Sequence, residues 1–396
     1  MGRGAVTTQA LRDNMEVHVR VANPSLAGRL SQYTGVGALR ESRMPSPWPG
    51  PPARPVGDPL LGVRERWYML GTSDLVGDDP VPVRALGEDL VLWRDGEGHP
   101  RLMADHCPHR GARLSIGDVV DGQLQCWYHH WRFDAGGQCM SVPSQGGACS
   151  LAARTRVEVA YPVEEQAGYL WAWMGADSPA PLALPEEFTD PRWSTFPETV
   201  AWSANWMLGL ENLVDLMHAP FLHARSITLN GGITDDRVLV TDHDDGFEVT
   251  RKNQSGANFD WIDVHLGALP HVRLDIPLPP SAGPGPDLRI LGFLLPRDND
   301  ETLVHFPRFR EVSGGERLIW RSLYRLRLRG THLHVLNQDK VMLESMRTVE
   351  EARRDEHLAQ ADQPVIHLRR MLEPVFAAQR ERFGLPAETP TKNVDD

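Results

Sequence analysis

The sequence has little cysteine, no long apolar run and a deficit of positive charge. Four cysteines in 396 residues do not favour a disulfide framework. The densest apolar stretch, Tyr169–Met174, is far shorter than the roughly 18 residues that a membrane helix needs. Lys and Arg number 41 against 53 acidic residues, which gives a formal net charge of −12. This balance argues against nucleic acid and anionic membranes as partners, because both require basic patches.

The composition is that of a soluble globular protein, with 41% hydrophobic and 24% charged residues. The length allows two or three domains. The N-terminus carries Arg3, Arg12 and Asp13 but no apolar core of a signal peptide, so we expect a cytoplasmic location.

Composition also divides the chain. The stretch Ser46–Pro55 contains five prolines and predicts a stiff linker, so residues 1–58 are expected to form an N-terminal extension. Short alternating runs separated by turn clusters fill residues 59–176 and predict a small antiparallel β domain, in which Asp121-Gly122 and Gly136-Gly137 are expected to form hairpin turns. Residues 177–396 are predicted to form an α+β domain. Its expected β segments are Arg237–Arg251, Leu288–Leu295, Leu303–Arg310 and Glu316–Leu328. Its expected helical segments are Asn205–His223 and Thr331–Arg347.

Two short motifs carry the most chemical information. Cys107-Pro108-His109 and Cys126-Trp127-Tyr128-His129 each join a thiolate to an imidazole, and sixteen residues separate them. This ligand set can hold one zinc ion, or a two-iron cluster in which two thiolates bind one iron and two imidazoles bind the other. Mixing Cys and His within both halves favours the cluster, since zinc sites usually take a like pair from each half.

The flanking residues strengthen this interpretation. The stretches Cys107–Gly117 and Cys126–Asp134 resemble the large-subunit family of Rieske non-heme iron oxygenases. The resemblance implies an all-β Rieske [2Fe–2S] domain, followed by a helix-grip-like α+β catalytic domain with an antiparallel sheet and a mononuclear Fe(II) site. Val142–Ser144 resembles the third loop that covers the cluster. Cys139 and Cys149 are expected to be free, buried or half-buried thiols.

The first helical segment of the second domain contains His218 and His223. On a straight helix these two side chains diverge, but Pro220 between them should break the helix and allow both imidazoles to face one ion. Two His and one carboxylate form the facial triad of non-heme Fe(II) oxygenases. The alternative is a pair of ordinary histidines at a helix end.

The third ligand is expected on the second helical segment. Asp339 falls within the apolar stripe of Val335, Met342 and Met346, where a lone carboxylate is costly unless it is paired or bound to metal. The resemblance also places the third ligand on a late helix. Glu344 is the fallback, and His332 and His334 are expected to be surface residues or partners behind the ligands.

The resemblance gives Asp215 a separate role. In the family, an aspartate three residues before the first His ligand links the two centres across a subunit interface. Here it would join His218 of one subunit to His129 of the next. This implies a homotrimer, because a head-to-tail contact closes into a ring. It also implies an NAD(P)H-dependent reductase, and in some members a ferredoxin, as electron donor.

The block Glu211–His223 resembles chlorophyllide a oxygenase and pheophorbide a oxygenase, and the doublet His129-His130 is similar to aminopyrrolnitrin oxygenase. These likenesses imply an electron-rich aromatic or pyrrole-type substrate. Monooxygenation by O2 is expected rather than cis-dihydroxylation, because the dioxygenases of the family usually have a partner β subunit. Demethylation and oxidative carbocyclisation are alternatives within the family. Two other classes remain open, a zinc-binding protein and a Rieske electron carrier without oxygenase activity.

Overall fold

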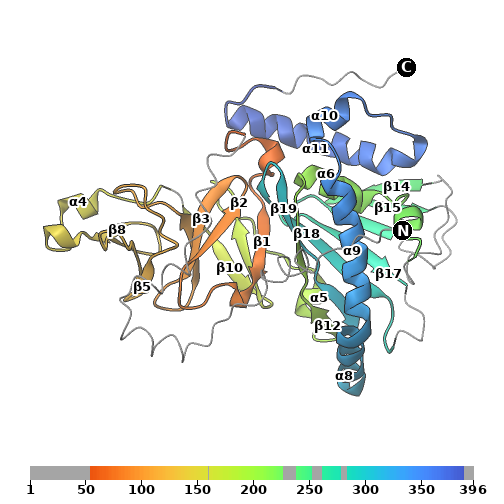
Figure 1. Cartoon of the computed structure of the whole chain (residues 1–396), viewed down its shortest axis with the longest axis horizontal. Coiled ribbons are helices and arrows are strands. Elements are labelled where there is room, and N and C mark those ends of the chain that lie inside the picture. Colours follow the sequence, from red (N-terminus) through yellow and green to blue (C-terminus); the bar gives the residue numbers. More distant parts are fainter. Residues whose placement is uncertain (1–53, 159, 226–237, 252–260, 278–282, 388–396) are drawn as a thin grey trace, which may run out of the picture. The chain divides into compact units, whose positions relative to one another are not determined.

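The computed structural model describes residues 54–387 except residues 159, 226–237, 252–260 and 278–282 (Figure 1). The chain divides into two compact units, residues 1–48 and 49–396, and all described residues belong to the second. All of the predicted N-terminal extension except residues 54–58 therefore lies outside the described residues. No helix in the described part is long and apolar enough to cross a bilayer.

Short antiparallel strands make up residues 67–173. Three sheets have the strand orders β1-β11-β10, β2-β3-β4-β9 and β5-β6-β7-β8. The strands are β1 (Trp67–Thr72), β2 (Val81–Ala85), β3 (Glu88–Arg94), β4 (Pro100–Ala104), β5 (Asp118–Val120), β6 (Gln123–Gln125), β7 (Arg132–Phe133), β8 (Cys139–Ser141), β9 (Ala160–Tyr161), β10 (Val163–Gln166) and β11 (Tyr169–Trp173). Asp121 and Gly122 join β5 to β6 with φ of 52° and 70°, which is the left-handed geometry of the tight hairpin turn that the sequence predicts.

The second half is built on a nine-stranded antiparallel sheet. Its main path has the order β12-β20-β18-β17-β16-β15-β14, and β19 pairs with β13 and β18. The strands are β12 (Trp193–Phe196), β13 (Thr199–Trp202), β14 (Val238–His243), β15 (Gly246–Arg251), β16 (Trp261–His265), β17 (His271–Ile276), β18 (Leu288–Asp298), β19 (Glu301–His305) and β20 (Arg308–Glu311). The predicted α+β domain with an antiparallel sheet is confirmed.

Helices follow and cover this sheet. They are α5 (Glu186–Thr189), α6 (Trp206–Val214), α7 (Ala219–Leu222), α8 (Gly314–Leu323), the π-helical turn η5 (Tyr324–Leu328), α9 (Arg329–Glu344), α10 (Val349–Arg354) and α11 (Gln363–Arg382). In Figure 1 the chain runs through α8 into the long helix α9, which crosses the strands of the sheet. Leu336 and Leu343 of α9 share one hydrophobic core with Ile276 and Ile290 of the sheet, so α9 is fixed by apolar packing.

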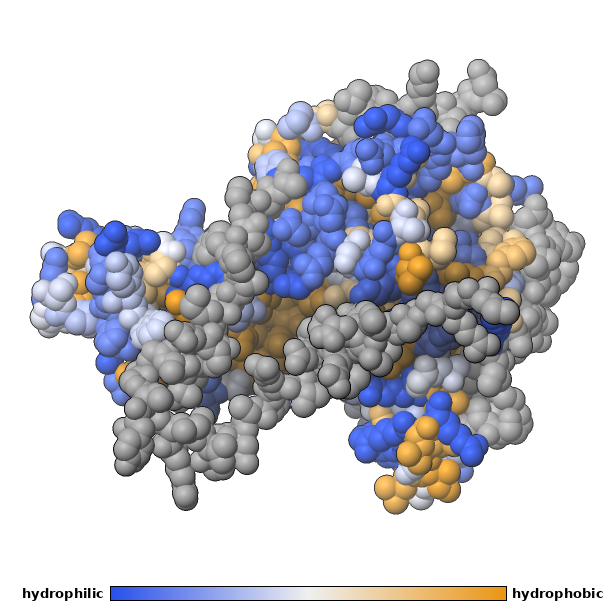
Figure 2. Space-filling model, viewed as in Figure 1, coloured by the Kyte–Doolittle hydropathy of each residue, from blue (hydrophilic) through white to orange (hydrophobic). Residues whose placement is uncertain are grey.

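One expected element is wrong. The sequence pattern predicted a β segment over Glu316–Leu328, whereas this stretch lies in α8 and η5. Trp320 and Tyr324, one helical turn apart, are its buried side chains, while Leu318, Ile319 and Leu326 are exposed. The exposed apolar residues produced the misleading alternation, and Figure 2 shows hydrophobic surface gathered at this end of the helix.

The two β regions share a hydrophobic core. Trp67 and Trp171 of the sheet β1-β11-β10 pack with Leu291 and Phe293 of β18. The backbone N–H of Leu86 donates to the carbonyl of Pro296, and Arg84 bridges Asp298 at 2.6 Å. Leu291 and Phe293 of the long strand β18 therefore pack with the first region, while Ile290 of the same strand belongs to the core that contains part of α9.

Candidate metal centres

The two Cys/His motifs occupy loops of the same construction. In the first loop, Cys107 N–H donates to the Ala112 carbonyl and Gly111 N–H to the Cys107 carbonyl, both at 2.8 Å. In the second, Cys126 N–H donates to the Trp131 carbonyl at 2.8 Å and His130 N–H to the Cys126 carbonyl at 2.9 Å.

The fourth residue after each cysteine has positive φ, 71° at Gly111 and 56° at His130. A non-glycine residue in this conformation is uncommon. His130 therefore occupies a position where the first loop has glycine.

Like groups of the two loops face one another. The Cys107 and Cys126 thiols are buried and within hydrogen-bonding contact, which lowers the pKa of Cys126 to about 6 and raises that of Cys107. The His109 and His129 rings lie 4.5 Å apart between centroids and are exposed. The Trp131 indole stacks on His109 at 4.5 Å and 5°, which fixes the imidazole plane.

This arrangement fits two iron ions better than one zinc. Tetrahedral zinc at about 2.0–2.3 Å from its ligands brings all four donor atoms within roughly 4 Å of one another. In the described chain, none of the groups of three donors within 4.8 Å contains either Cys107 or Cys126. A thiolate pair beside an imidazole pair is what a Rieske cluster requires.

None of the four cysteines, all of them described, forms a disulfide. Cys139 is buried and Cys149 half-buried, as predicted.

The second set of predicted ligands converges from two helical segments. Chain direction changes between α6 and α7, so that His218 precedes α7 and His223 ends it. Asp339 reaches them from the buried face of α9. The donor atoms of all three residues lie within 4.8 Å of one another.

The sequence placed the break at Pro220, whereas α6 already ends at Val214 and Pro220 lies in the first turn of α7. The imidazoles of both histidines still face Asp339.

The three donors point to a common position rather than to each other. Asp339 Oδ1 lies 3.1 Å from His223 Nε2 and 3.6 Å from His218 Nε2, yet it is buried and forms no hydrogen bond. A buried carboxylate oxygen without a donor is costly. This orphaned oxygen beside two Nε2 atoms fits a bound divalent metal with the donor set of a facial triad.

Residues behind the triad hold the imidazoles in place. Gln338 Oε1 lies 3.1 Å from His223 Nδ1, and its amide donates to the Leu222 carbonyl at 3.0 Å. Asp215 Oδ2 lies 3.4 Å from His218 Nδ1. Burial alone would raise the pKa of Asp215, but the hydrogen bond and charge of His218 hold it below its usual value. Each contact directs the Nε2 atom toward Asp339, the usual arrangement around metal-bound histidine.

The other residues considered as ligands, or as partners of the ligands, are not part of the triad. Glu344 accepts from Ser203 N–H at 2.8 Å and is not in the triad. His334 is exposed. His332 is buried and lines the same pocket as the triad, where burial lowers its pKa to about 3 and keeps the ring neutral.

The triad lines a partly open pocket in the described part of the chain. Its walls are mostly aliphatic and aromatic side chains: Leu213, Leu274, Ile276, Ile290, Phe306, Val335 and Leu336. Arg308, on β20, also lines the pocket and is 1% exposed. Neither Arg308 nor Gln338 was expected from the sequence to belong to the site. For Arg308, the available signal was a charged residue inside a predicted strand.

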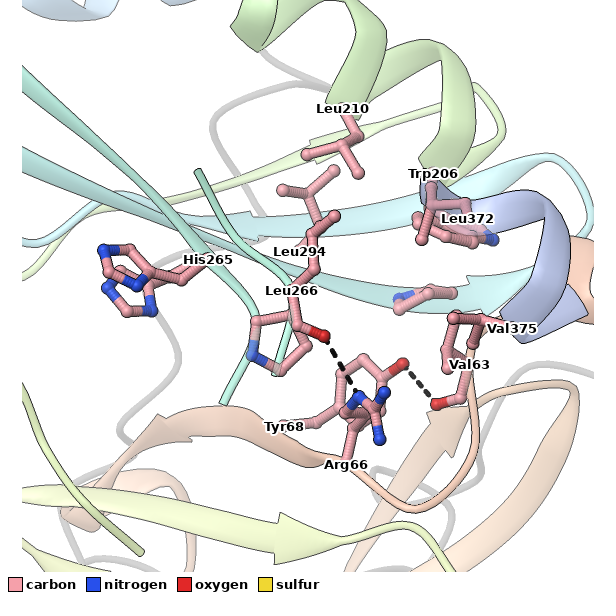
Figure 3. A pocket seen from close by; sticks show the side chains of 13 residues that line it. Val63, Arg66, Tyr68, Trp206, Leu210, His265, Leu266, Leu294, Leu372 and Val375 are labelled. Carbon is pink, nitrogen blue, oxygen red and sulfur yellow. Dashed lines mark hydrogen bonds between the residues drawn. The ribbon is translucent and has the colours of Figure 1, made fainter. Parts of the chain in front are cut away.

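A second pocket, of about 530 Å³, lies between β1, α6, β18 and α11 (Figure 3). In it Arg66 donates to the Leu266 carbonyl and Tyr68 to the Val63 carbonyl. It contains none of the predicted metal ligands.

A further His/Asp group, unforeseen from the sequence, consists of His243, Asp263 and His265. Asp263 accepts from both rings at 3.1–3.2 Å, and Asp245 contacts His265 at 3.0 Å. These groups satisfy one another without a metal ion.

Comparisons with known proteins match both regions of the chain. A model of the Rieske [2Fe-2S] domain matches residues 66–157, and a model of the vanillate O-demethylase oxygenase C-terminal domain matches residues 202–378. Protein TIC 55, chloroplastic, of Arabidopsis thaliana is 33% identical over 50% of this chain and 36% of its own length. Chlorophyllide a oxygenase, chloroplastic, of Chlamydomonas reinhardtii is 36% identical over 44% of this chain and 26% of its own. The chain thus spans well under half of these relatives.

A solved complex of carbazole 1,9a-dioxygenase, an oxygenase with its ferredoxin, has the same fold. Its TM-score is 0.67 at 21% identity, covering 84% of this chain and 96% of that one.

Proposed function

Because the chain belongs to the Rieske non-heme iron oxygenase family, we propose that it is a terminal oxygenase that uses O2 to monooxygenate an aromatic or pyrrole-type substrate. The observation that carries the proposal is the convergence of His218, His223 and Asp339 in an apolar pocket, in the same chain as the paired Cys/His loops. An electron carrier would have no use for such a pocket.

The proposed cluster ligands are Cys107 and Cys126 on one iron and His109 and His129 on the other. A bound [2Fe–2S] cluster would supply single electrons, and His ligation would raise its potential relative to an all-Cys cluster. The exposed imidazoles support electron entry at this surface. We assign this role to a domain spanning residues 59–176 and the oxygen chemistry to residues 177–396, with residues 1–58 as an extension.

In the second domain, His218, His223 and Asp339 would hold a mononuclear Fe(II), which activates O2 when bound. Gln338 and Asp215 keep the two Nε2 atoms directed at the metal position. The aliphatic walls bind an aromatic ring by burial and exclude water from the reacting atoms.

The proposed assembly is a homotrimer in which Asp215 of one subunit meets His129 of the next. The exposed position of His129 and the exposed apolar residues Leu318, Ile319 and Leu326 support a subunit contact. We propose an NAD(P)H-dependent reductase, with or without a ferredoxin, as donor. The carbazole oxygenase complex with ferredoxin supports such a partner. Cys139 and Cys149, the two cysteines outside the proposed cluster, form no disulfide, which supports a cytoplasmic location.

A second candidate is O-demethylation, which the match to the vanillate O-demethylase oxygenase C-terminal domain favours. It uses the same centres, and hydroxylation of a methoxy carbon would release formaldehyde. Analysis of products for formaldehyde distinguishes the two.

Single-turnover chemistry tests the proposal. Protein reduced anaerobically and then mixed with O2 and a panel of aromatic compounds should yield a hydroxylated product as the cluster reoxidises. His223→Ala should keep the cluster spectrum and form no product, since it lacks one triad donor. His334→Ala, an exposed histidine on α9, is the matched control and should behave as wild type. Product formation unchanged in His223→Ala would overturn the proposal.

A further inference from the structure

The pocket of the triad holds a buried positive charge. Arg308 is 1% exposed, and its Nε and Nη1 atoms are buried without a hydrogen-bond acceptor. Burying a guanidinium group with unmet donors is strongly unfavourable unless a negative group joins it. The arginine is held in place because β20 pairs with both β12 and β18 at this position.

The neighbouring carboxylate, Glu198, does not accept a hydrogen bond from the Nη1 atom of Arg308. Glu198 Oε2 is 3.8 Å from Arg308 Nη1, too far for a hydrogen bond. Both Glu198 oxygens accept from Arg329, at 2.9 and 3.2 Å. The single negative charge of Glu198 thus lies beside two positive charges, those of Arg308 and Arg329.

His332 adds a second unmet donor beside the arginine. Its Nδ1 lies 3.4 Å from the Tyr324 hydroxyl, and its Nε2 is buried without a partner. With the Tyr324 hydroxyl donating to Nδ1, the proton of the neutral ring lies on Nε2. Arg308 and His332 both line the pocket that contains the triad.

We propose that the substrate carries an oxyanion, a carboxylate or sulfonate attached to its aromatic ring, and that Arg308 binds this group with help from His332. This inference rests on the proposed function, because it names the substrate class of the same pocket. The aliphatic walls take the ring, and Arg308 fixes which of its carbons faces the triad. Arg308 is therefore a specificity-determining residue.

Equilibrium binding to the anaerobic holoprotein tests the inference with matched probe pairs, benzoate with benzamide and 2-naphthoate with 2-naphthamide. The acid and the amide have nearly the same shape and differ in charge. Wild type should bind each acid about ten- to hundredfold more tightly than its amide, the range expected for a hydrogen bond to a charged group. Arg308→Gln should remove this preference, and Arg308→Lys should keep part of it.

Arg310→Gln is the matched control. Arg310 is equally buried on the same strand, but its guanidinium donates to the carbonyls of Pro286, Gly283 and Gly285. This variant should keep the preference for the acid. The inference is overturned if the acids fail to bind wild type, if they bind no tighter than the amides, or if Arg308→Gln retains the preference.

Iron content and the cluster spectrum, recorded on the same samples, separate this inference from the proposed function. If the protein contains both centres but binds the acid no more tightly than the amide, only this inference is contradicted. Protein lacking iron contradicts both.

Discussion

The two candidate centres are built in opposite ways. The four cluster residues lie within 23 residues of sequence, on two loops with the same hydrogen-bond pattern, and their imidazoles face solvent. The triad joins residues 121 positions apart, and His223 is 1% exposed. An electron must enter from another protein and needs an exposed ligand, whereas oxygen chemistry needs a site that excludes water. The contrast supports the proposal that one region relays electrons and that the other carries out the reaction.

The largest expected effect comes from removing a cluster thiolate. Cys126→Ser should abolish visible absorption and acid-labile sulfide while the triad keeps its iron, and turnover should fall by more than about 100-fold, beyond the cost of losing an outer-shell contact. Cys149→Ser, which replaces the sulfur acceptor at the N-cap of the short helix α4 (Ser150–Ala153) with an oxygen acceptor, should change neither. Spectroscopy and iron analysis of both variants check this. Loss of the triad iron together with the cluster would contradict the separation of the two regions.

Asp215→Asn tests the connection between the regions. The amide keeps an acceptor for Met217 N–H, now at 2.6 Å from Asp215 Oδ1, but removes the negative charge beside His218. Cluster reoxidation in a single turnover should slow by about 10–100-fold with iron content unchanged. Glu211→Gln, on the same helix but paired with Arg369, is the control and should reoxidise normally. A wild-type rate in Asp215→Asn would remove the proposed link.

The buried histidines should make the catalytic region the more sensitive to acid. Burial lowers the pKa of His305 to about 4, so the folded protein keeps it neutral while the unfolded chain binds a proton below about pH 6.5. Stability from this group is therefore complete above pH 6.5 and is lost as the pH falls toward 4, by roughly 3 kcal/mol. In urea titrations, His305→Gln should lose less stability over this range than wild type. Equal losses in the two proteins would contradict this.

The smallest expected effect lies at the tip of a cluster loop. His130 has a φ of 56°, where glycine is free of strain, so His130→Gly should raise stability by about 0.5–1 kcal/mol. Ala167→Gly, at φ 53° and outside the loop, should give a similar gain. If His130 contacts a redox partner, only His130→Gly should slow cluster reduction in stopped-flow experiments. A loss of stability on its substitution would show that the side chain makes a structural contact.

The local features of this chain were predictable, and the non-local ones were not. Alternation and turn residues predicted the antiparallel strands, and the Asp121-Gly122 hairpin is confirmed. The structure also brings the donor atoms of His218, His223 and Asp339 together. Asp339 is buried as expected, but Met342 and Met346 of the predicted apolar stripe are exposed. The role of the triad residues as ligands stays a prediction, as does the role of the Cys/His loops.

The failures share one physical cause. Glu316–Leu328 alternates like a strand, but tertiary packing buries Trp320 and Tyr324 along a helical face and leaves Leu318 and Leu326 exposed. Arg308 belongs to a predicted strand, yet only the assembled sheet and α9 show that its charge faces the triad pocket. Long-range packing decides both, and a single sequence carries little information about it.

The metal content of protein purified without air tests the central claim most directly. Two distinct iron centres predict about three iron atoms and about two acid-labile sulfides per chain. Stoichiometric zinc, iron without sulfide, or equal iron and sulfide with none left for the triad would contradict the account.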